Sequence, residues 1–462
     1  MTVAGELARR IVASKFDQFT PAVVHYAKIG LLDTLGVGIA GSCEPAAVIA
    51  RRVVGNQPGD ALVWGTSQRS DPLEAAFLNG IAANVLDFDD CTDNLGGHPS
   101  APVLPALFAL GEKLGACGRD VITAYVVGFE IETQLGRGLN FHHYEKGWHP
   151  TSTLGVFGAG AASAKLLGLD EERTTHTLAL CASMASGLKS NLGSMGKPMH
   201  VGQCSRNGLL AALLASEGFT ANTNAFEHHQ GFFEVFNGKG TYSVDRILHK
   251  WGNPWEIEMP GIAVKQYPCC LGTQSAVDLM LQLVRGNDVR PEEVTEISAK
   301  TSARRLEHTN RPEPHSALDA KLSIQYVLAR ALLDRSVTLE HFAGDGFKSA
   351  AVRDAMALIR ATPFDKQDAR DMGADIAIQL ANGRVVSGSI DRPIGHAAGM
   401  PISQEALETK FKACARQYLS SDKSEQIIQS VADFDRLNDV RSLLALLEPS
   451  NMLAGQPRRA RH

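Results

Sequence analysis

Residues 74–86 read EAAFLNGIAANVL, and this stretch sets the character of the fold. Alanine and glycine dominate it, and larger apolar side chains recur at helical spacing, so it predicts a helix that packs closely against its neighbours. Similar Ala- and Gly-rich segments predict helices at residues 102–114, 121–135, 153–167, 174–188 and 205–217. We therefore expect a helical domain with small-residue interfaces.

An acidic segment follows the first of these helices directly. Residues 87–100 read DFDDCTDNLGGHPS and contain four carboxylates, one imidazole and two glycines. The helix places the acids at its C-terminal end, where the helix dipole disfavours negative charge, so we expect a cation nearby. The segment is too short and too polar for a core element. It predicts an active-site loop that contains Asp87 and His98.

Length and composition limit the possible classes of protein. A chain of 462 residues exceeds the usual single-core limit of about 250 to 300 residues, so we expect two domains. Hydrophobic residues make up 44% and charged residues 21%, as in ordinary globular proteins. The net charge of -5 provides no basic surface for nucleic acid, so an acidic substrate would need a locally cationic pocket.

Targeting signals and cysteine chemistry point to the cytoplasm. Residues 1–10 mix acids and bases and do not form a secretory signal. The longest apolar runs, 29–40 and 154–169, are interrupted by charge and are too short to span a bilayer, so we expect no membrane segment. The eight cysteines form no CxxC pair and no zinc spacing, which indicates reduced thiols in a cytosolic enzyme.

The hydrophobic pattern changes between residues 254 and 268, where prolines and aromatics interrupt the helical period. Residues 294–302 predict a strand, and alternating apolar residues from Ile376 lead to Asn382-Gly383, a strong hairpin signal. Residues 393–401 predict a loop, and residues 402–418 and 421–447 predict helices again. We therefore predict a mainly α fold with an α+β second domain: helical residues 1–262, an α+β lid at 263–400, a helical return at 401–454 and a disordered tail at 455–462.

The acidic loop supports two functional interpretations. Asp89, Asp90 and Asp93 match the DDxxD pattern with which isoprenoid synthases bind Mg²⁺ and a diphosphate. A second metal motif is incomplete, because Leu446 stands where its last acid is needed, and the aromatic content is only 6%. Alternatively, the acids position His98. A solvated acidic loop without a function is the third interpretation.

Three histidines lie close together in residues 141–153, FHHYEKGWHPTST. No further cysteine or acid at zinc spacing accompanies them, so we expect no metal site. Threonines 151 and 153 are expected to cap the following helix, so His149 would lie across a helix N-terminus and act as an acid/base or carboxylate-binding group. His142 and His143 are equally well explained as surface residues.

Two lysines are candidate cations. Lys197 lies in GSMGKPMH at residues 193–200, which lacks the spacing of a nucleotide-binding phosphate loop. This ammonium group could bind a substrate carboxylate, move a proton or form a Schiff base, or it could be a solvated loop lysine. Lys265 begins KQYPCCLGTQ at the domain boundary, where ligand sites are common, and could supply a second cation. We expect no disulfide between Cys269 and Cys270.

Taken in order, these segments resemble the 2-methylcitrate dehydratase (MmgE/PrpD) family, which also includes cis-aconitate decarboxylase and iminodisuccinate epimerase. The likeness extends to LLDTLGVG at residues 31–38 and DAKLSIQY at residues 319–326. It implies a large all-helical domain formed from both chain ends, a smaller α+β lid and a homodimer. It also implies chemistry on small di- or tricarboxylates in the interdomain cleft without a cofactor or metal.

The resemblance also implies site residues, with two departures. It places Asp87, His98, His149, Lys197 and Lys265 along the site, with His308 a looser candidate. Relatives commonly have threonine at the position of Cys91, and the dehydratases and decarboxylases often have histidine at the position of Cys270.

Proton abstraction next to a carboxylate creates negative charge, so the site needs a base and concentrated positive charge. An epimerase can dispense with a leaving-group acid, so cysteine at position 270 favours an epimerase of an amino-linked dicarboxylate such as iminodisuccinate. A lyase acting on cis-aconitate or 2-methylcitrate is the alternative. The expected catalytic residues are His98, His149 and Lys197, and the expected substrate-binding residues are Asp87, Cys91, Lys265, Cys270 and His308.

Overall fold

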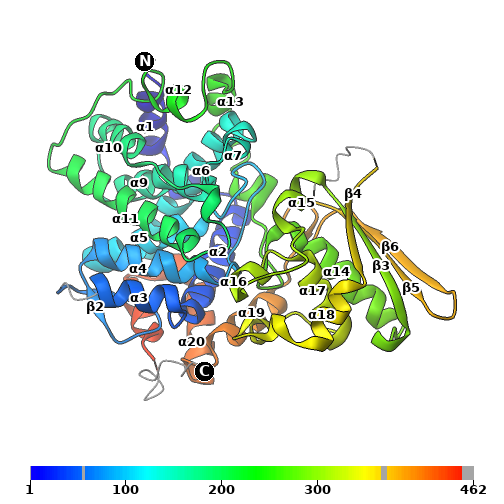
Figure 1. The fold of residues 1–462 in the computed structure, drawn as a ribbon. Coiled ribbons are helices and arrows are strands. Elements are labelled where there is room, and N and C mark those ends of the chain that lie inside the picture. Colours follow the sequence, from blue (N-terminus) through cyan, green and yellow to red (C-terminus); the bar gives the residue numbers. More distant parts are fainter. Residues whose placement is uncertain (1, 55–57, 366–371, 450–462) are drawn as a thin grey trace. The chain divides into compact units, whose positions relative to one another are not determined.

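The computed structural model describes residues 2–54, 58–365 and 372–449, and it divides the chain into two units (Figure 1). The first unit joins the residues up to Val264 with those from Ser403 onward, and the second spans Lys265–Ile402. Helices dominate the first unit, and the four-stranded sheet lies in the second. The expectation of a mainly helical chain with a sheet-containing second region is confirmed.

The described helices of the first unit run along nearly all of it. They are α1 (Val3–Ala13), α2 (Pro21–Gly41), α3 (Pro45–Val54), α4 (Pro72–Val85), α5 (Ser100–Leu114), α6 (Gly118–Leu139), α7 (His142–Glu145), α8 (Pro150–Thr153), α9 (Gly155–Leu166), α10 (Glu171–Met184), α11 (Gly196–Ser216), α12 (Phe232–Phe236), α13 (Val244–Leu248), α19 (Gln404–Ala415), α20 (Ser421–Ala432) and α21 (Arg441–Leu444). Two short strands, β1 (Ala61–Leu62) and β2 (Arg69–Ser70), pair antiparallel.

Local sequence signals explain where the helices that matter for the site begin. Thr20 caps α2 by accepting a hydrogen bond from the Val23 amide at 3.2 Å, and Pro21 follows as the first helical residue. Asp71 caps α4 in the same way, again with a proline next. The short polar cap satisfies an amide that has no partner within the helix, so each helix starts at a defined residue.

Helices α4 and α11 pack closely because glycine lies at their crossing. A Cβ atom added to Gly80 of α4 would lie 2.8 Å from the Cα atom of Gly202 of α11, closer than real side chains allow. Helix α4 leads into the acidic loop, and α11 begins beside Lys197. The small residues that the sequence showed in 74–86 therefore set the distance between the two elements that carry site residues.

Helix α2 is long and apolar enough to cross a membrane by length and composition alone. In the structure, 72% of its most apolar window is buried. Its buried residues include Leu31, Leu35 and Ile39, which belong to the core of the first unit. This is the burial of a core helix, although α2 is longer than the apolar run of 29–40 that the sequence showed.

The second unit contains a four-stranded sheet and its covering helices. The strands are β3 (Val294–Thr301), β4 (Ile359–Pro363), β5 (Ala374–Leu380) and β6 (Val385–Ile390), in the order β4-β3-β5-β6. Strands β3 and β4 are parallel and the other pairs are antiparallel. The helices are α14 (Leu271–Gly286), α15 (Ala303–Thr309), α16 (Ala317–Ala320), α17 (Ile324–Asp334) and α18 (Ala350–Ala357).

The expected hairpin is present in this sheet. Strands β5 and β6 pair with Ile378 opposite Val386, and Gly383 between them has a positive φ of 86°. Alternate residues of β5 are buried, on the side where α14 contacts the sheet. The period-two pattern in the sequence thus marks the face that packs against a helix.

Three expectations from the sequence need correction or fall outside the description. Residues 393–401 contain two short paired strands, β7 (Ile394–Gly395) and β8 (Met400–Pro401), where a loop was expected. Residues 421–447 do not form one helix, because the chain turns after Ala432 so that the Leu437 carbonyl can accept a hydrogen bond from the Gly118 amide at 2.8 Å. The tail predicted to be disordered, 455–462, lies outside the described residues.

Candidate active site

The acidic loop begins where α4 ends and is held at several points along its backbone. Asp87 adopts a positive φ of 53°, which is uncommon for a residue other than glycine and turns the chain out of the helix. Cys91 exchanges two backbone hydrogen bonds with Ala263, at 2.8 and 2.7 Å. Such pairing makes the loop an ordered part of the first unit.

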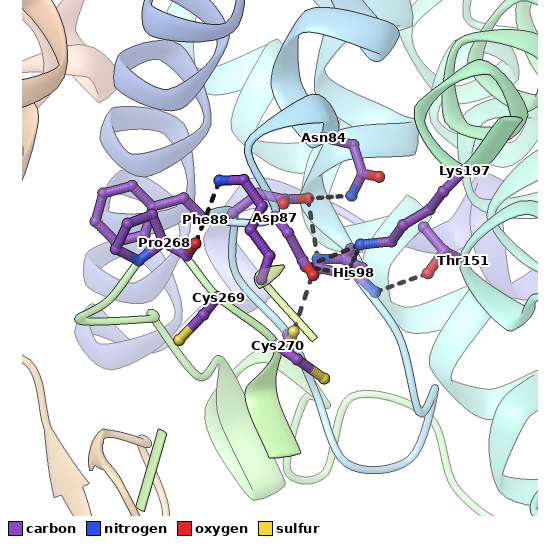
Figure 2. Close-up of polar contacts among 12 residues, drawn as sticks. Asn84, Asp87, Phe88, His98, Thr151, Lys197, Pro268, Cys269 and Cys270 are labelled. Atoms are coloured by element: carbon purple, nitrogen blue, oxygen red, sulfur yellow. Dashed lines mark hydrogen bonds and ion pairs between the residues drawn. The ribbon is translucent and has the colours of Figure 1, made fainter. Parts of the chain in front are cut away.

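Both ring nitrogens of His98 contact charged groups of the first unit (Figure 2). Nδ1 lies 3.0 Å from Oδ2 of Asp89, and Nε2 lies 3.5 Å from Oδ1 of Asp87. The Nζ atom of Lys197 lies 2.8 Å from the same Asp87 oxygen and 3.4 Å from Nε2 of His98. We call these four residues the His98 cluster; all are largely or fully buried.

The cluster favours one arrangement of protons. An ionised Asp89 can only accept hydrogen bonds, so Nδ1 of His98 is the nitrogen that carries hydrogen. Nε2 of the neutral ring is then an acceptor, which matches a hydrogen bond donated by the ammonium group of Lys197. The result is a neutral imidazole with its lone pair beside a cation, an arrangement suited to proton transfer.

A side chain of helix α8 holds the backbone of His98. The His98 amide donates a hydrogen bond to Oγ1 of Thr151 at 3.1 Å. The preceding Gly97 makes this approach possible, because an added Cβ atom would lie only 2.6 Å from the same Oγ1 atom. Thr151, expected from the sequence to cap a helix, instead holds the loop that carries His98.

A third carboxylate of the loop contacts Ser100 in place of His98. Asp90 is fully buried and accepts hydrogen bonds from the amide and the hydroxyl of Ser100, whose Oγ lies 2.5 Å from the Tyr125 hydroxyl. Burial, together with the nearby carboxylates of Asp33 and Asp89, raises the pKa of Asp90 well above its usual value. Asp90 therefore ties the two ends of the loop together.

These contacts argue against the diphosphate interpretation. Asp89 and Asp90 lie outside any helix, and their carboxylates have different partners, His98 and Ser100. Asp93 is only half-buried. Carboxylates one helical turn apart, as the DDxxD pattern requires, are not formed by these described residues. The pattern in the sequence is a coincidence of the loop composition.

His149 forms a second imidazole centre. It occupies the N-cap position of α8, and its Nδ1 atom lies 3.4 Å from Nδ1 of His200. Burial lowers the pKa of His149 well below its usual value, and the positive charges of Lys197 and His200 add to this effect. His149 is therefore neutral at physiological pH and offers one donor and one acceptor nitrogen.

The structure separates the two neighbouring histidines, for which a surface position was one of two equal interpretations. His142 is exposed, but His143 is fully buried between Trp148 and Phe236 and hydrogen-bonds to Asn237 Oδ1 and Thr153 Oγ1, both at 2.7 Å. Its burial lowers its pKa to about 4. His143 is a core residue with a structural role.

Of the interpretations given for Lys197, the solvated loop lysine does not match the structure. It lies in the first turn of α11, and only 12% of its side chain is exposed. A cation is unfavourable at a helix N-terminus, and the carboxylate of Asp87 offsets this cost. The cation expected near the acidic loop is therefore this residue. Cys91 completes the surroundings, with Sγ 3.7 Å from Nδ1 of His98.

The remaining candidates belong to the second unit. Lys265 is buried, and His308 is half-buried in α15. Cys270 is the N-cap residue of α14, and its amide donates a hydrogen bond to the Lys321 carbonyl at 2.9 Å. The Gln274 side chain accepts hydrogen bonds from two amides of the 265–270 segment and so fixes its path. Cys269 and Cys270 are free thiols, as expected.

Sequence reasoning gave no definite role to three residues that the structure places beside its candidates. Asp89 was one of the loop acids expected either to bind a metal ion or to position His98, Thr151 was expected only to cap a helix, and His200 was quoted in a motif without a role. Their residue types gave a signal, since carboxylate, hydroxyl and imidazole all suit a polar site. Their partners depend on which helices meet.

The donor atoms of Asp87, Asp89 and His98 lie within 4.8 Å of one another, close enough to hold a metal ion. The Lys197 ammonium group, however, already lies 2.8 Å from the Asp87 carboxylate. A divalent ion would have to coexist with this cation at close range, which like charges disfavour. The arrangement fits a lysine-neutralised acid better than a metal centre.

The fold and the His98 cluster define a two-unit helical protein with a buried acid/base centre of imidazoles, carboxylates and an ammonium group. The MmgE/PrpD N-terminal domain model matches residues 5–245, and the MmgE/PrpD C-terminal domain model matches residues 267–436. The chain therefore belongs to the MmgE/PrpD family.

Similar proteins cover almost the whole chain. Cis-aconitate decarboxylase of Homo sapiens is 30% identical, over 97% of this chain and 95% of its own length. Cis-aconitate decarboxylase of Aspergillus terreus is 27% identical, over 93% of both chains. The 2-methylcitrate dehydratase of Escherichia coli is 23% identical, over 90% of both chains.

Proposed function

We propose that this protein is a lyase of small polycarboxylates, with decarboxylation of cis-aconitate as the leading reaction and dehydration of 2-methylcitrate as the second candidate. The relatives described above are named for these two reactions, and the decarboxylases share more sequence with the chain. This changes the preference for an iminodisuccinate epimerase, which rested on cysteine at position 270 and which these relatives do not support.

The observation that carries the proposal is the contact between Lys197 and His98. When CO₂ leaves a carboxylate, the electron pair of the broken C–C bond stays on the substrate, and carbon must gain a proton. When water leaves, a proton is lost next to a carboxylate and hydroxide departs. Both reactions need a group that transfers protons beside positive charge, and His98 with Lys197 at 3.4 Å supplies both.

In this proposal, His98 and His149 have different roles in proton transfer. His98 has its tautomer set by Asp89, so its Nε2 atom is the proton-transferring atom: it removes the proton in dehydration, and in decarboxylation it takes a proton from the Lys197 ammonium group and delivers it to the carbon that CO₂ leaves. His149, kept neutral by burial, supplies a second acceptor or donor. Lys197 stabilises the carboxylate charge that builds up during the reaction, and Asp87 holds the ammonium group in place.

The resemblance and the reduced cysteines support the other parts of the proposal. Lys265, Cys270 and His308 of the second unit, with Cys91, are substrate-binding candidates on the resemblance alone. All eight cysteines are free thiols, which agrees with a cytoplasmic location. A homodimer and the absence of a cofactor are carried over from the family resemblance, and the mass of the protein in solution tests the former.

One experiment tests the reaction. The purified protein is incubated in D₂O with cis-aconitate, with 2-methylcitrate and with each iminodisuccinate stereoisomer, and products are followed by NMR. CO₂ loss from cis-aconitate with deuterium incorporation at one carbon supports the leading reaction. Water loss from 2-methylcitrate would move the second candidate to first place.

The same samples separate the other interpretations. Scrambled stereochemistry of iminodisuccinate, without CO₂ or water loss from the other substrates, would overturn the lyase proposal in favour of the epimerase. Loss of turnover with EDTA would point to a metal ion. A His98→Gln variant prepared in parallel should show no turnover, which confirms that the activity belongs to this protein.

A further inference from the structure

A buried lysine from the C-terminal part of the chain lies beneath the acidic loop. Lys410 of α19 is only 8% exposed, and its Nζ atom donates a hydrogen bond to the Phe88 carbonyl at 2.7 Å. The same atom lies 2.5 Å from Oδ1 of Asp33 in α2 and 4.0 Å from the centre of the Phe88 ring. One ammonium group therefore joins two helices from opposite ends of the chain to the loop.

The residue that Lys410 holds lies between the two acids that contact His98. Asp87 precedes Phe88 and contacts Nε2, whereas Asp89 follows it and contacts Nδ1. Asp87 has a positive φ, a conformation that persists only where the surroundings hold it. The Phe88 carbonyl belongs to the peptide plane between Phe88 and Asp89, so fixing it sets the backbone that leads from the strained Asp87 into Asp89, and with it the relative positions of the two carboxylates.

Stability alone is a poor explanation for this arrangement. A buried ion pair loses its hydration, and apolar replacements of similar volume are often neutral or stabilising. Asp33 is buried together with Lys410, with 0% of its side chain exposed. An apolar residue at position 410 could not donate a hydrogen bond to the Phe88 carbonyl. The specific function of the ammonium group therefore concerns the loop.

We propose that Lys410 is a positioning residue: by holding the Phe88 carbonyl, it sets the separation of Asp87 and Asp89 and thereby the orientation of His98. The effect on turnover rests on the proposed function. The effect on the imidazole does not, since it concerns the geometry of the protein without substrate.

The matched pair of variants is Lys410→Met and Lys412→Met. Both change a lysine of α19, but the Lys412 side chain is 43% exposed and pairs with Glu425 on the surface. Imidazole ¹⁵N NMR of the full-length protein reports the tautomer of His98, whose signals are assigned by their loss in His98→Gln. Lys410→Met should shift these signals or mix the two tautomers, and Lys412→Met should leave them unchanged.

A second variant covers the case in which Lys410→Met fails to fold because Asp33 is left buried without its partner. Asp33→Asn combined with Lys410→Met removes both charges and still leaves the Phe88 carbonyl without its donor. It should show the same altered His98 signals and, on the substrate identified above, at least about a 10-fold lower kcat with an altered pH profile. Unchanged His98 signals in the folded double variant would overturn the proposal. Absence of turnover in the wild-type protein would overturn only the proposed function.

Discussion

Asp89 Oδ2 lies 3.0 Å from Nδ1 of His98, and the Asn84 side chain donates a hydrogen bond to the same Asp89 oxygen at 2.9 Å. Asn84 lies near the end of α4, so the orientation of the imidazole is tied to the end of a rigid helix. A carboxylate at Nδ1 leaves the other ring nitrogen available for chemistry. The sequence left open whether the loop acids bind a metal ion or position His98; this contact favours the second interpretation and makes Asp89 part of the proposed catalytic centre.

Asp89→Asn is therefore expected to lower kcat by at least about 100-fold with little change in KM, because the amide can present a donor to Nδ1 and so favour the wrong tautomer. Steady-state kinetics on the substrate identified by NMR checks this. Asp93→Asn in the same loop should retain normal kinetics. If both variants lose activity equally, the acids act together, as the DDxxD interpretation requires.

Replacing Lys197 by alanine should raise the free energy of the transition state by about 2 kcal/mol or more, roughly a 30-fold loss in kcat/KM. The physical reason is the loss of an ammonium group that contacts both His98 and Asp87. Arg206→Ala is the control, since Arg206 lies on the same helix and pairs with Glu74. Equal kinetics for Lys197→Ala and wild type would remove Lys197 from the centre.

Gly97→Ala should displace His98 without unfolding the first unit. The new methyl group would lie 2.6 Å from Oγ1 and 3.0 Å from the amide nitrogen of Thr151, so the loop must move away from α8. We expect kcat/KM to fall by about 100-fold, as misplaced reacting groups commonly do. Gly286→Ala, which meets no atom within 4 Å, is the control for glycine replacement. Normal activity of Gly97→Ala would show that the Thr151 contact is dispensable.

Acid should destabilise the protein partly through His143. Its pKa is about 4 in the folded state and about 6.5 when unfolded, so the unfolded state binds more protons between these values. The stability from the neutral ring is complete above pH 6.5 and is lost as the pH falls to 4, about 3 kcal/mol in total.

Urea denaturation at pH 7.5 and pH 4.5 measures this effect. His143→Gln should lose less stability than wild type between the two pH values, because the amide does not titrate. His142→Gln, at the exposed neighbouring position, should behave like wild type. Parallel losses in all three proteins would show that His143 does not contribute to acid sensitivity.

The parts of the fold that depend on local patterns could be predicted from the sequence. The period-two alternation ending at Asn382-Gly383 marked the β5–β6 hairpin, and the small residues of 74–86 marked a closely packed helix. The helix at 421–447 was wrong, because a long-range hydrogen bond between Gly118 and Leu437 accompanies a turn that helical periodicity does not show. Local propensity cannot anticipate such a contact.

The candidate site likewise has residues that the sequence suggested and a property, the burial of each histidine, that only the structure shows. Unusual residues in polar segments and the family resemblance made Asp87, His98, His149 and Lys197 candidates, and the structure shows Lys197 contacting both Asp87 and His98. The sequence did not distinguish His143 from its exposed neighbour, because burial depends on the aromatic residues that later segments bring to it.

The sequence by itself determined the helical character, the sheet hairpin and the kinds of groups in the centre, because periodicity and side-chain chemistry are local properties. Only the tertiary structure decided that Asp89 faces His98 while Asp90 faces Ser100, and that Lys410 reaches Phe88 across 322 residues of sequence. These pairings follow from how helices cross and where the backbone of one loop turns. Packing therefore determines which of several similar acids contacts the imidazole.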